Sequence, residues 1–451
     1  MQKRRSRLAE GPVGKHLIDM TVPVLFGIAM MMGQSLIDTW FIGQVGDAEL
    51  AAYSFGFPIL MIVTSVAIGL GAGTSSVVAR ALGADDHRRA RRLSTDSLFL
   101  SFLMTAVIAV IGILTIEPLF TLLGAPAEML PLISSFMTIL YIGVPFVVVG
   151  MVGMASMRAT GDTRLPSMLM VLAAVLNIIL DPILIFGIGP IPRMGLDGAA
   201  MAALLARGTI FFGTVYLMRY RLDMISFNKP DFGEMRSSWA DILHVGIPAA
   251  GTNVIVPLGA TVVTAMIARY GPDAVAGFGV ASRIESMMLV LYYALSAIIG
   301  PFVGQNLSAN HGDRILESLW LTTKFCLLSG LGIAILLAVM SGVLPGLFSD
   351  SPDVVGVTRL FLWIVPLSYG SYGMVMVMNA AFNGMGQPMP GVWVSVGRIA
   401  VLYVPLAVIG MWLIGLSGIF VAYAAANIIT GFGAYIWARR TVRRISAPQP
   451  A

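Results

Sequence analysis

Twelve long apolar runs fill most of this 451-residue sequence and limit what it can fold into. Each run provides about 20 residues or more, the length that an α-helix needs to cross the hydrocarbon core of a bilayer. Strands that cross a membrane are about half as long, so the runs predict helices. We place the spans at residues 17–42, 51–79, 94–116, 130–156, 165–187, 196–218, 241–268, 275–305, 315–343, 356–382, 390–413 and 416–438.

The composition agrees with a multi-pass membrane protein. Charged residues make up only 11% of the chain, whereas about 25% is usual in a soluble domain. The 49 Gly and 24 Pro are scattered through apolar runs without a period, which excludes a fibrous or disordered chain. Twelve spans leave only helix ends and short loops, so we expect an all-α integral membrane protein without a large soluble domain.

Lys and Arg are concentrated in alternate loops. The amino-terminal arm, the loops after even-numbered spans and the carboxyl-terminal tail hold 21 of the 28 cations. Because cytoplasmic loops carry the excess of Lys and Arg, we expect both termini on the cytoplasmic side of the inner membrane. This distribution, rather than nucleic-acid binding, accounts for the net charge of +5.

The two halves of the sequence align at an offset of 225 residues, which drifts to 220 where Gly198 meets Gly418. Six pairs share this register: Pro23 and Pro248, Gly46 and Gly271, Ala51 and Ala276, Leu82 and Leu307, Ala84 and Ala309, and Gly161 and Gly386. Each half holds six spans, so both insert in the same direction. Such parallel repeats are a transporter architecture with the substrate path between two lobes; the alternative is chance identity between helices of similar composition.

The repeat predicts the domain organisation. We expect two pseudo-symmetric six-helix lobes, an N-lobe at residues 1–218 and a C-lobe at 241–438. A cytoplasmic linker at 219–240 joins them, and a basic tail follows at 439–451.

Two carboxylates lie inside apolar spans, Asp38 and Asp181. Each has an amide four residues earlier, Gln34 before Asp38 and Asn177 before Asp181, and this spacing places carboxylate and amide on one helix face. Both acids fall in the last third of their spans, so we expect similar depth and a shared site. Pro182 adds an acceptor, because its missing N–H frees the carbonyl of Ile178.

This residue set can bind a cation. A buried carboxylate costs several kcal/mol to keep ionised, and a second one nearby adds repulsion, so the pair can load a proton. The same oxygens can instead ligate Na⁺, so Asp38 and Asp181 are the metal ligands if sodium is the coupling ion. The alternative role for each Asp is a helix-end residue whose side chain reaches the outer interface.

Prolines and glycines interrupt several spans. Pro23 and Pro248 are candidate hinges, and Gly69, Gly71 and Gly73 serve either motion or close helix packing.

Methionines are abundant, with 29 in the chain. Thioethers suit promiscuous apolar binding, so Met287, Met374 and Met378, with Tyr369, are candidates for a substrate cavity, although packing is the alternative role.

The remaining charges within spans are better explained by structural pairing than by a site. They are Arg207, Arg283, Glu285, Lys324, Arg359 and Arg398.

Catalytic signatures are missing from the sequence. HExxH, GxSxG and GxxxxGK[ST] do not occur, so zinc hydrolase, serine esterase and ATP-driven classes are not indicated. We therefore expect neither an enzyme nor a cofactor, and an ion gradient as the energy source.

Several segments together resemble the multidrug and toxic compound extrusion (MATE) transporters. They are IDTWFIGQVGDAELAA in the first span, RATGDTRLP after the fourth, NIILDPILIFG in the fifth and VGQNLSANHGDR closing the eighth. The resemblance implies two six-helix lobes with a central cavity, and export of amphipathic, often cationic compounds in exchange for H⁺ or Na⁺. It also implies that Asp38, Asp181 and Asn177 couple the ion.

The resemblance has one departure. Gly198 to Ala203 read GAAMAA where many members have GAAxAT, so a hydroxyl near the site is missing and protons are favoured over sodium. We therefore predict a proton-coupled multidrug antiporter. The alternatives are a sodium-coupled antiporter and a lipid or polysaccharide flippase of the same superfamily. The partners are small substrates and membrane lipids, and the oligomeric state is not indicated.

Overall fold

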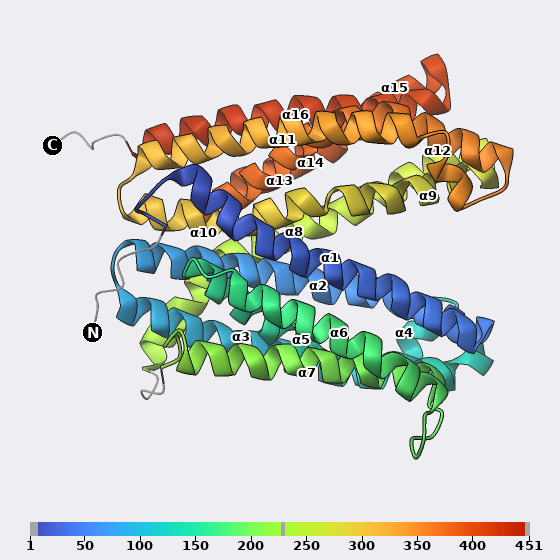
Figure 1. Cartoon of the computed structure of the whole chain (residues 1–451), viewed down its shortest axis with the longest axis horizontal. Helices are drawn as coiled ribbons and strands as arrows, with labels where there is room; N and C mark the ends of the chain where they lie inside the picture. Colours follow the sequence, from blue (N-terminus) through green and yellow to red (C-terminus); the bar gives the residue numbers. More distant parts are fainter. Residues whose placement is uncertain (1–7, 227–230, 447–451) are drawn as a thin grey trace. The chain divides into compact units, whose positions relative to one another are not determined.

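The computed structural model of the protein describes residues 8–226 and 231–446 (Figure 1). In these two ranges every regular element is a helix and no strand occurs. Twelve helical segments are long and apolar enough to cross a membrane, which confirms the predicted fold class. The predicted cytoplasmic cations Lys3, Arg4, Arg5, Arg7 and Lys229 lie outside the described residues, as do positions 447–451 of the predicted tail.

The chain divides into two compact units, which we call the N-unit and the C-unit. The N-unit is Val22–Ala250, and the C-unit is Met1–Thr21 together with Gly251–Ala451. Two helices therefore pass from one unit to the other. The first turns of α1 (Val13–Val45) belong to the C-unit, and the first half of α8 (Phe232–Ile267) belongs to the N-unit. For this reason the unit bounds differ from lobes at 1–218 and 241–438.

The other helices follow in chain order. Those of the N-unit are α2 (Asp47–Gly83), α3 (His87–Leu114), α4 (Ile116–Leu122), η1 (Ala127–Met129), α5 (Leu130–Ala159), α6 (Arg164–Phe186) and α7 (Gly195–Tyr220). Those of the C-unit are η2 (Ala268–Tyr270), α9 (Pro272–Met288), α10 (Val290–Ser308), α11 (Gly312–Met340), η3 (Leu344–Leu347), α12 (Pro352–Ile364), η4 (Val365–Ser368), α13 (Tyr369–Gly384), α14 (Met389–Val396), η5 (Gly397–Tyr403), α15 (Val404–Ile414) and α16 (Leu416–Ile445).

Three predicted spans of the C-unit are interrupted. The span expected at 275–305 is two helices, α9 and α10, with the break at Leu289. A short 3₁₀ segment, η4, separates α12 from α13 and contains Pro366, whose ring carries no N–H to continue an α-helical ladder. Between α14 and α15 the chain forms a π-helix, η5, a rare geometry that is frequent at functional positions.

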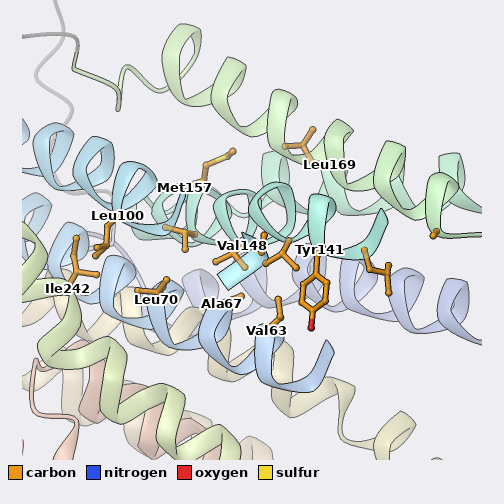
Figure 2. Packing of buried hydrophobic residues seen from close by; sticks show 14 of the residues in the cluster. Val63, Ala67, Leu70, Leu100, Tyr141, Val148, Met157, Leu169 and Ile242 are labelled. Atoms are coloured by element: carbon orange, nitrogen blue, oxygen red, sulfur yellow. The ribbon is translucent and has the colours of Figure 1, made fainter. Parts of the chain in front are cut away.

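The core of the N-unit is built around α5, which packs against α2, α3 and α7. Figure 2 shows part of this layer of buried side chains, including Ala67 of α2, Leu100 of α3 and Val148 of α5. Ala67 and Val148 have no exposed surface. Fully burying a branched aliphatic side chain stabilises a structure by about 1.5–3 kcal/mol, and this layer fixes the helices that carry the polar residues described below.

Two glycines allow α2 to lie directly against α8. A Cβ atom on Gly73 would meet the carbonyl oxygen of Ile242 at 2.2 Å, and one on Gly69 would meet the carbonyl oxygen of Gly246 at 2.5 Å. Both distances are shorter than any real Cβ contact, so only glycine fits at either position. A Cβ atom on Gly71 would meet nothing closer than the Ala155 side chain at 3.5 Å, which is an ordinary contact distance. Of the two roles considered for these glycines, the structure assigns close packing to Gly69 and Gly73.

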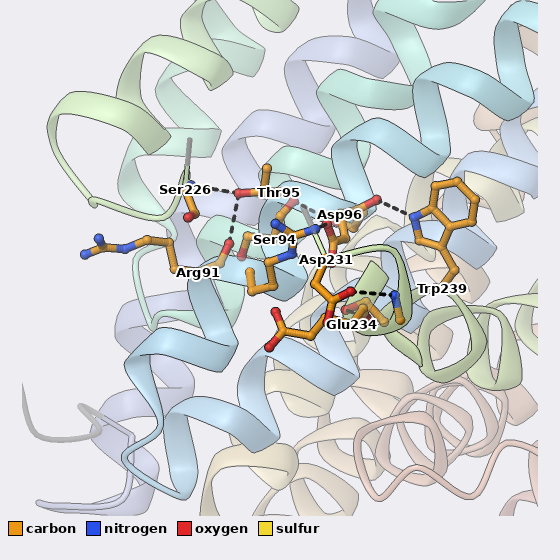
Figure 3. Close-up of polar contacts among 12 residues, drawn as sticks. Arg91, Ser94, Thr95, Asp96, Ser226, Asp231, Glu234 and Trp239 are labelled. Carbon is orange, nitrogen blue, oxygen red and sulfur yellow. Dashed lines mark hydrogen bonds and ion pairs between the residues drawn. The ribbon is translucent and has the colours of Figure 1, made fainter. Parts of the chain in front are cut away.

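Polar contacts fix the start of α8 to α3 within the N-unit (Figure 3). The indole Nε1 of Trp239 donates to the backbone carbonyl of Asp96 at 3.1 Å, and the Trp239 ring stacks on Phe99. The Asp96 carboxylate pairs with Arg92 one turn earlier, with both residues nearly buried. Arg89 reaches Asp241 of α8 at 3.1 Å. These contacts hold the first half of α8 in the N-unit.

The start of α1 is held in the C-unit by an equivalent arrangement. Arg314 donates to the carbonyl oxygens of Leu8 and Gly11 at 3.0 and 2.6 Å. Asn306 also donates to Leu8, at 3.1 Å. Asn306 and Arg314 belong to the segment VGQNLSANHGDR, so one of the segments that carry the family resemblance serves to anchor this helix.

Candidate functional site

The four polar residues predicted to form an ion-coupling site come together inside the N-unit. Gln34 donates its side-chain amide to Asp38 at 2.7 Å along α1, and Asn177 donates to Asp181 at 2.9 Å along α6. Gln34 also donates to the side-chain carbonyl of Asn177. The two helices are therefore joined by a continuous chain of hydrogen bonds that runs from Asp38 through Gln34 and Asn177 to Asp181.

In this hydrogen-bonded series, each of the two carboxylates keeps one oxygen without a hydrogen-bond partner. Asp38 Oδ1 and Asp181 Oδ2 are buried and take part in no hydrogen bond within the described residues. Asp181 is 1% exposed and Asn177 is 2% exposed. A buried polar atom without a partner costs about 1–3 kcal/mol, more if it is charged, so these two oxygens are the atoms that gain most from a bound cation.

The two carboxyl groups lie within hydrogen-bonding reach of each other. Two acceptor-only carboxylates repel at such a separation, and a hydrogen bond between them requires a proton on one of them. A proton on one of the free oxygens would therefore turn repulsion into a hydrogen bond. Pro182 follows Asp181 inside α6 and, lacking an N–H, leaves the Ile178 carbonyl without its helical donor.

A fixed cation lies near the site. Arg207 of α7 is close enough to act electrostatically on Asp38 and on Tyr53 of α2. From the sequence, Arg207 is one of the charges expected to pair across helices or to reach the membrane interface. The positive charge of Arg207 offsets part of the negative charge of Asp38 and disfavours the binding of a second cation next to Asp38.

The site around Asp38 and Asp181 contains only two carboxylates that could ligate a metal ion. No group of three or more His, Cys, Asp and Glu side chains forms a metal-binding cluster in the described part of the chain. A sodium ion here would be ligated by two carboxylates and by amide or backbone carbonyl oxygens.

The candidates for a substrate cavity lie in the C-unit and differ in exposure. Tyr369, Met374 and Met378 of α13 have no exposed surface and pack in the interior of the unit. Met287 near the end of α9 is 39% exposed. In this structure these side chains are packed against their own unit, and their part in a substrate cavity stays a prediction.

The candidate hinges lie next to the places where the chain passes between units. Pro23 is inside α1, two residues after Thr21, the last residue of the first C-unit segment. Pro248 is in α8, two residues before Ala250, where the N-unit ends. A proline inside a helix removes one backbone hydrogen bond and favours bending. Both helices are therefore weakened close to the point where the chain passes from one unit to the other.

Comparison with known proteins gives matches over nearly the whole chain. The family model described as MatE matches residues 23–183 and again 248–409, so the two matches begin 225 residues apart, the offset of the repeat. The FAD transporter of Shewanella oneidensis is 39% identical over 99% of this chain and 98% of its own length. The probable multidrug resistance protein YoeA of Bacillus subtilis is 25% identical over 94% of this chain and 92% of its own length. Among solved structures, the Vibrio cholerae MATE transporter VcmN in the bent form superposes with a TM-score of 0.91 at 31% identity, covering 98% of this chain and all of the other.

Proposed function

Because this chain belongs to the MatE family of multidrug and toxic compound extrusion transporters, we propose that it is a secondary active antiporter that exports small organic molecules in exchange for protons. Family membership makes it a multi-pass membrane transporter and not an enzyme. The observation that carries the proposal is the hydrogen-bonded chain from Asp38 to Asp181, with one free, buried oxygen at each end.

One sequence feature favours the proton over sodium as the coupling ion. The segment GAAMAA lacks a hydroxyl ligand at Ala203. Coupling to sodium is the alternative, in which the same free oxygens become metal ligands.

Protonation provides the conformational step. Neutralising one carboxylate removes the repulsion between Asp38 and Asp181 and lets the two helices α1 and α6 bind each other more tightly. The change acts on α1, which is weakened at Pro23, and its bending toward the site would release the substrate outward. The structural relative VcmN has been solved in a bent form. One inward proton at 100 mV supplies about 2.3 kcal/mol, enough for roughly a fiftyfold gradient of a neutral solute.

Two classes of cargo have support from the comparisons. Similarity to multidrug resistance and multidrug export proteins favours amphipathic, often cationic compounds. Similarity to a FAD transporter, at 39% identity over 99% of the chain, favours a flavin dinucleotide. A lipid or polysaccharide cargo is the remaining alternative. The distribution of Lys and Arg supports a location in the inner membrane with both termini in the cytoplasm.

Transport by the purified protein in liposomes tests the proposal. Ethidium and FAD are loaded separately, and a pH gradient or a sodium gradient is imposed in turn. We expect flux of at least one cargo with the pH gradient alone. Flux with the sodium gradient alone would show that sodium, and not the proton, is the coupling ion. Absence of flux with both gradients would overturn the proposal and favour the flippase alternative.

A further inference from the structure

The C-unit contains a second buried polar cluster, which the coupling mechanism does not use. Its residues come from five helices, and we call it the Arg398 cluster: Glu285, Ser368, Tyr372, Arg398, Tyr403, Tyr423 and Asn427. The sequence had assigned Glu285 and Arg398 to ordinary structural pairing. The two do interact electrostatically, yet they do not form a direct ion pair.

Arg398 is the centre of this cluster and its charge is incompletely compensated. It is only 3% exposed. One terminal nitrogen donates to Asn427 Oδ1 at 3.0 Å, and the guanidinium lies over the Tyr372 ring at 4.5 Å. The side chain of Tyr423 also interacts with the guanidinium. The Arg398 Nε is nevertheless buried without a hydrogen-bond partner, and no carboxylate forms an ion pair with Arg398 in the described part of the chain. A buried guanidinium without a carboxylate partner is costly, and within a membrane such a group marks a functional site by default.

Two features indicate a binding role rather than packing alone. Arg398 lies in the π-helix η5, a geometry that is rare and concentrated at functional sites. The cluster also reaches the surface of its unit, because Glu285 and Tyr423 are only partly buried while Arg398 behind them is almost fully buried. A group entering beside Tyr423 would therefore approach a guanidinium that has a free donor.

We propose that the Arg398 cluster is the substrate subsite for an anionic group, a phosphate or carboxylate attached to an aromatic ring system. This inference rests on the proposed export function and specifies the cargo. The planar guanidinium suits such anions because its donors match two oxygens at once. Tyr423, which is only partly buried, offers aromatic surface for the ring system, and the buried Tyr403 supports it with the two ring centroids 4.9 Å apart.

Glu285 sets the selectivity of this subsite. Its carboxylate accepts a hydrogen bond from Tyr423 at 3.0 Å and attracts Arg398 from beyond ion-pair distance. An incoming anion competes with Glu285 for the same positive charge and is repelled by it. Removing the Glu285 charge should therefore strengthen anion binding, an effect that a damaged protein would not produce.

The experiment compares an anionic with uncharged and cationic ligands. Binding of FAD, riboflavin and ethidium to the detergent-purified full chain is measured by fluorescence for the wild type, Arg398→Gln, Arg398→Lys and Glu285→Gln. Arg359→Gln is the matched control, since Arg359 is an exposed arginine of the same unit that donates to the Ser341 carbonyl. We expect Arg398→Gln to weaken FAD binding about ten- to hundredfold, Arg398→Lys to weaken it less, and Glu285→Gln to strengthen it. Riboflavin and ethidium binding should change little.

Two results would overturn the inference. One is equal weakening of all three ligands in Arg398→Gln with no gain in Glu285→Gln, which would make the cluster structural. The other is a wild type that exports ethidium but does not bind FAD, which would leave the proposed export function intact and reject the anion subsite. Failure of the proposed function has a different signature, the absence of gradient-driven flux in liposomes.

Discussion

Gln34 of α1 donates its side-chain amide both to Asp38 on its own helix and to Asn177 on α6. This amide is the link that makes two separate carboxylate–amide pairs into one site. Through it, a change in the charge of either carboxylate alters the interaction between two membrane-spanning helices, and that is what an ion-coupled transporter requires.

Asp181→Asn should abolish proton-driven transport. The asparagine keeps the size of the side chain but cannot carry the exchanged proton, so flux under a pH gradient should fall to the leak rate of protein-free liposomes. Asp353→Asn, in the exposed first turn of α12, is the control and should keep the wild-type rate. Wild-type flux in Asp181→Asn would show that this carboxylate does not couple transport.

Gln34→Ala should weaken the contact between α1 and α6. It leaves Asn177 Oδ1 without its donor in a nearly buried position, a loss of about 1–3 kcal/mol. Thermal unfolding in detergent should show a lower midpoint, and flux driven by a pH gradient should fall. Thr64→Ala in α2 is the control, because the exposed Thr64 hydroxyl donates to the Leu60 carbonyl of its own helix. An unchanged unfolding midpoint in Gln34→Ala would show that the hydrogen bond from Gln34 to Asn177 does not stabilise the contact between α1 and α6.

Gly73→Ala should destabilise the protein although alanine is the better helix former. The new Cβ would meet the Ile242 carbonyl oxygen at 2.2 Å, and relieving such a clash costs about 1–3 kcal/mol. Gly332→Ala in α11 has nothing within 4 Å of the added Cβ and should stabilise by up to about 1 kcal/mol. Thermal midpoints that shift in the same direction for both variants would argue against direct backbone contact between α2 and α8.

Asp96→Asn should be far more damaging than Asp241→Asn. Asp96 and Arg92 are 4% and 10% exposed, so loss of the carboxylate leaves a buried guanidinium unpaired, at a cost of about 3–5 kcal/mol. Asp241 and Arg89 are 54% and 30% exposed, and such pairs contribute about 1 kcal/mol or less. Denaturant unfolding measures both variants, and equal losses would show that the Arg92–Asp96 pair is effectively solvated.

The features that follow from local spacing could be predicted from the sequence. The twelve spans follow from run length, and the pairs Gln34 with Asp38 and Asn177 with Asp181 follow from the four-residue helical spacing. The similar depth of the two acids in their spans predicts that the two pairs share a site. In the structure the hydrogen bond from Gln34 to Asn177 joins the two pairs.

Contacts between distant helices could not be predicted. Arg207 lies near Asp38, and Arg398 lies over Tyr372, only because separate helices pack together, and no sequence period encodes such pairs. The break at Leu289 has no proline to signal it. The passage of α1 and α8 between units depends on tertiary contacts such as Trp239 with Asp96 and Arg314 with Leu8.

The most direct test of the central claim measures protons released when cargo binds. Purified protein in weakly buffered, sodium-free detergent solution is mixed with the cargo that it transports, and a pH indicator reports protons. If Asp38 and Asp181 exchange a proton for substrate, the wild type should release protons in proportion to bound cargo, and Asp181→Asn should release none. No proton release by the wild type, or equal release by Asp181→Asn, would contradict the account.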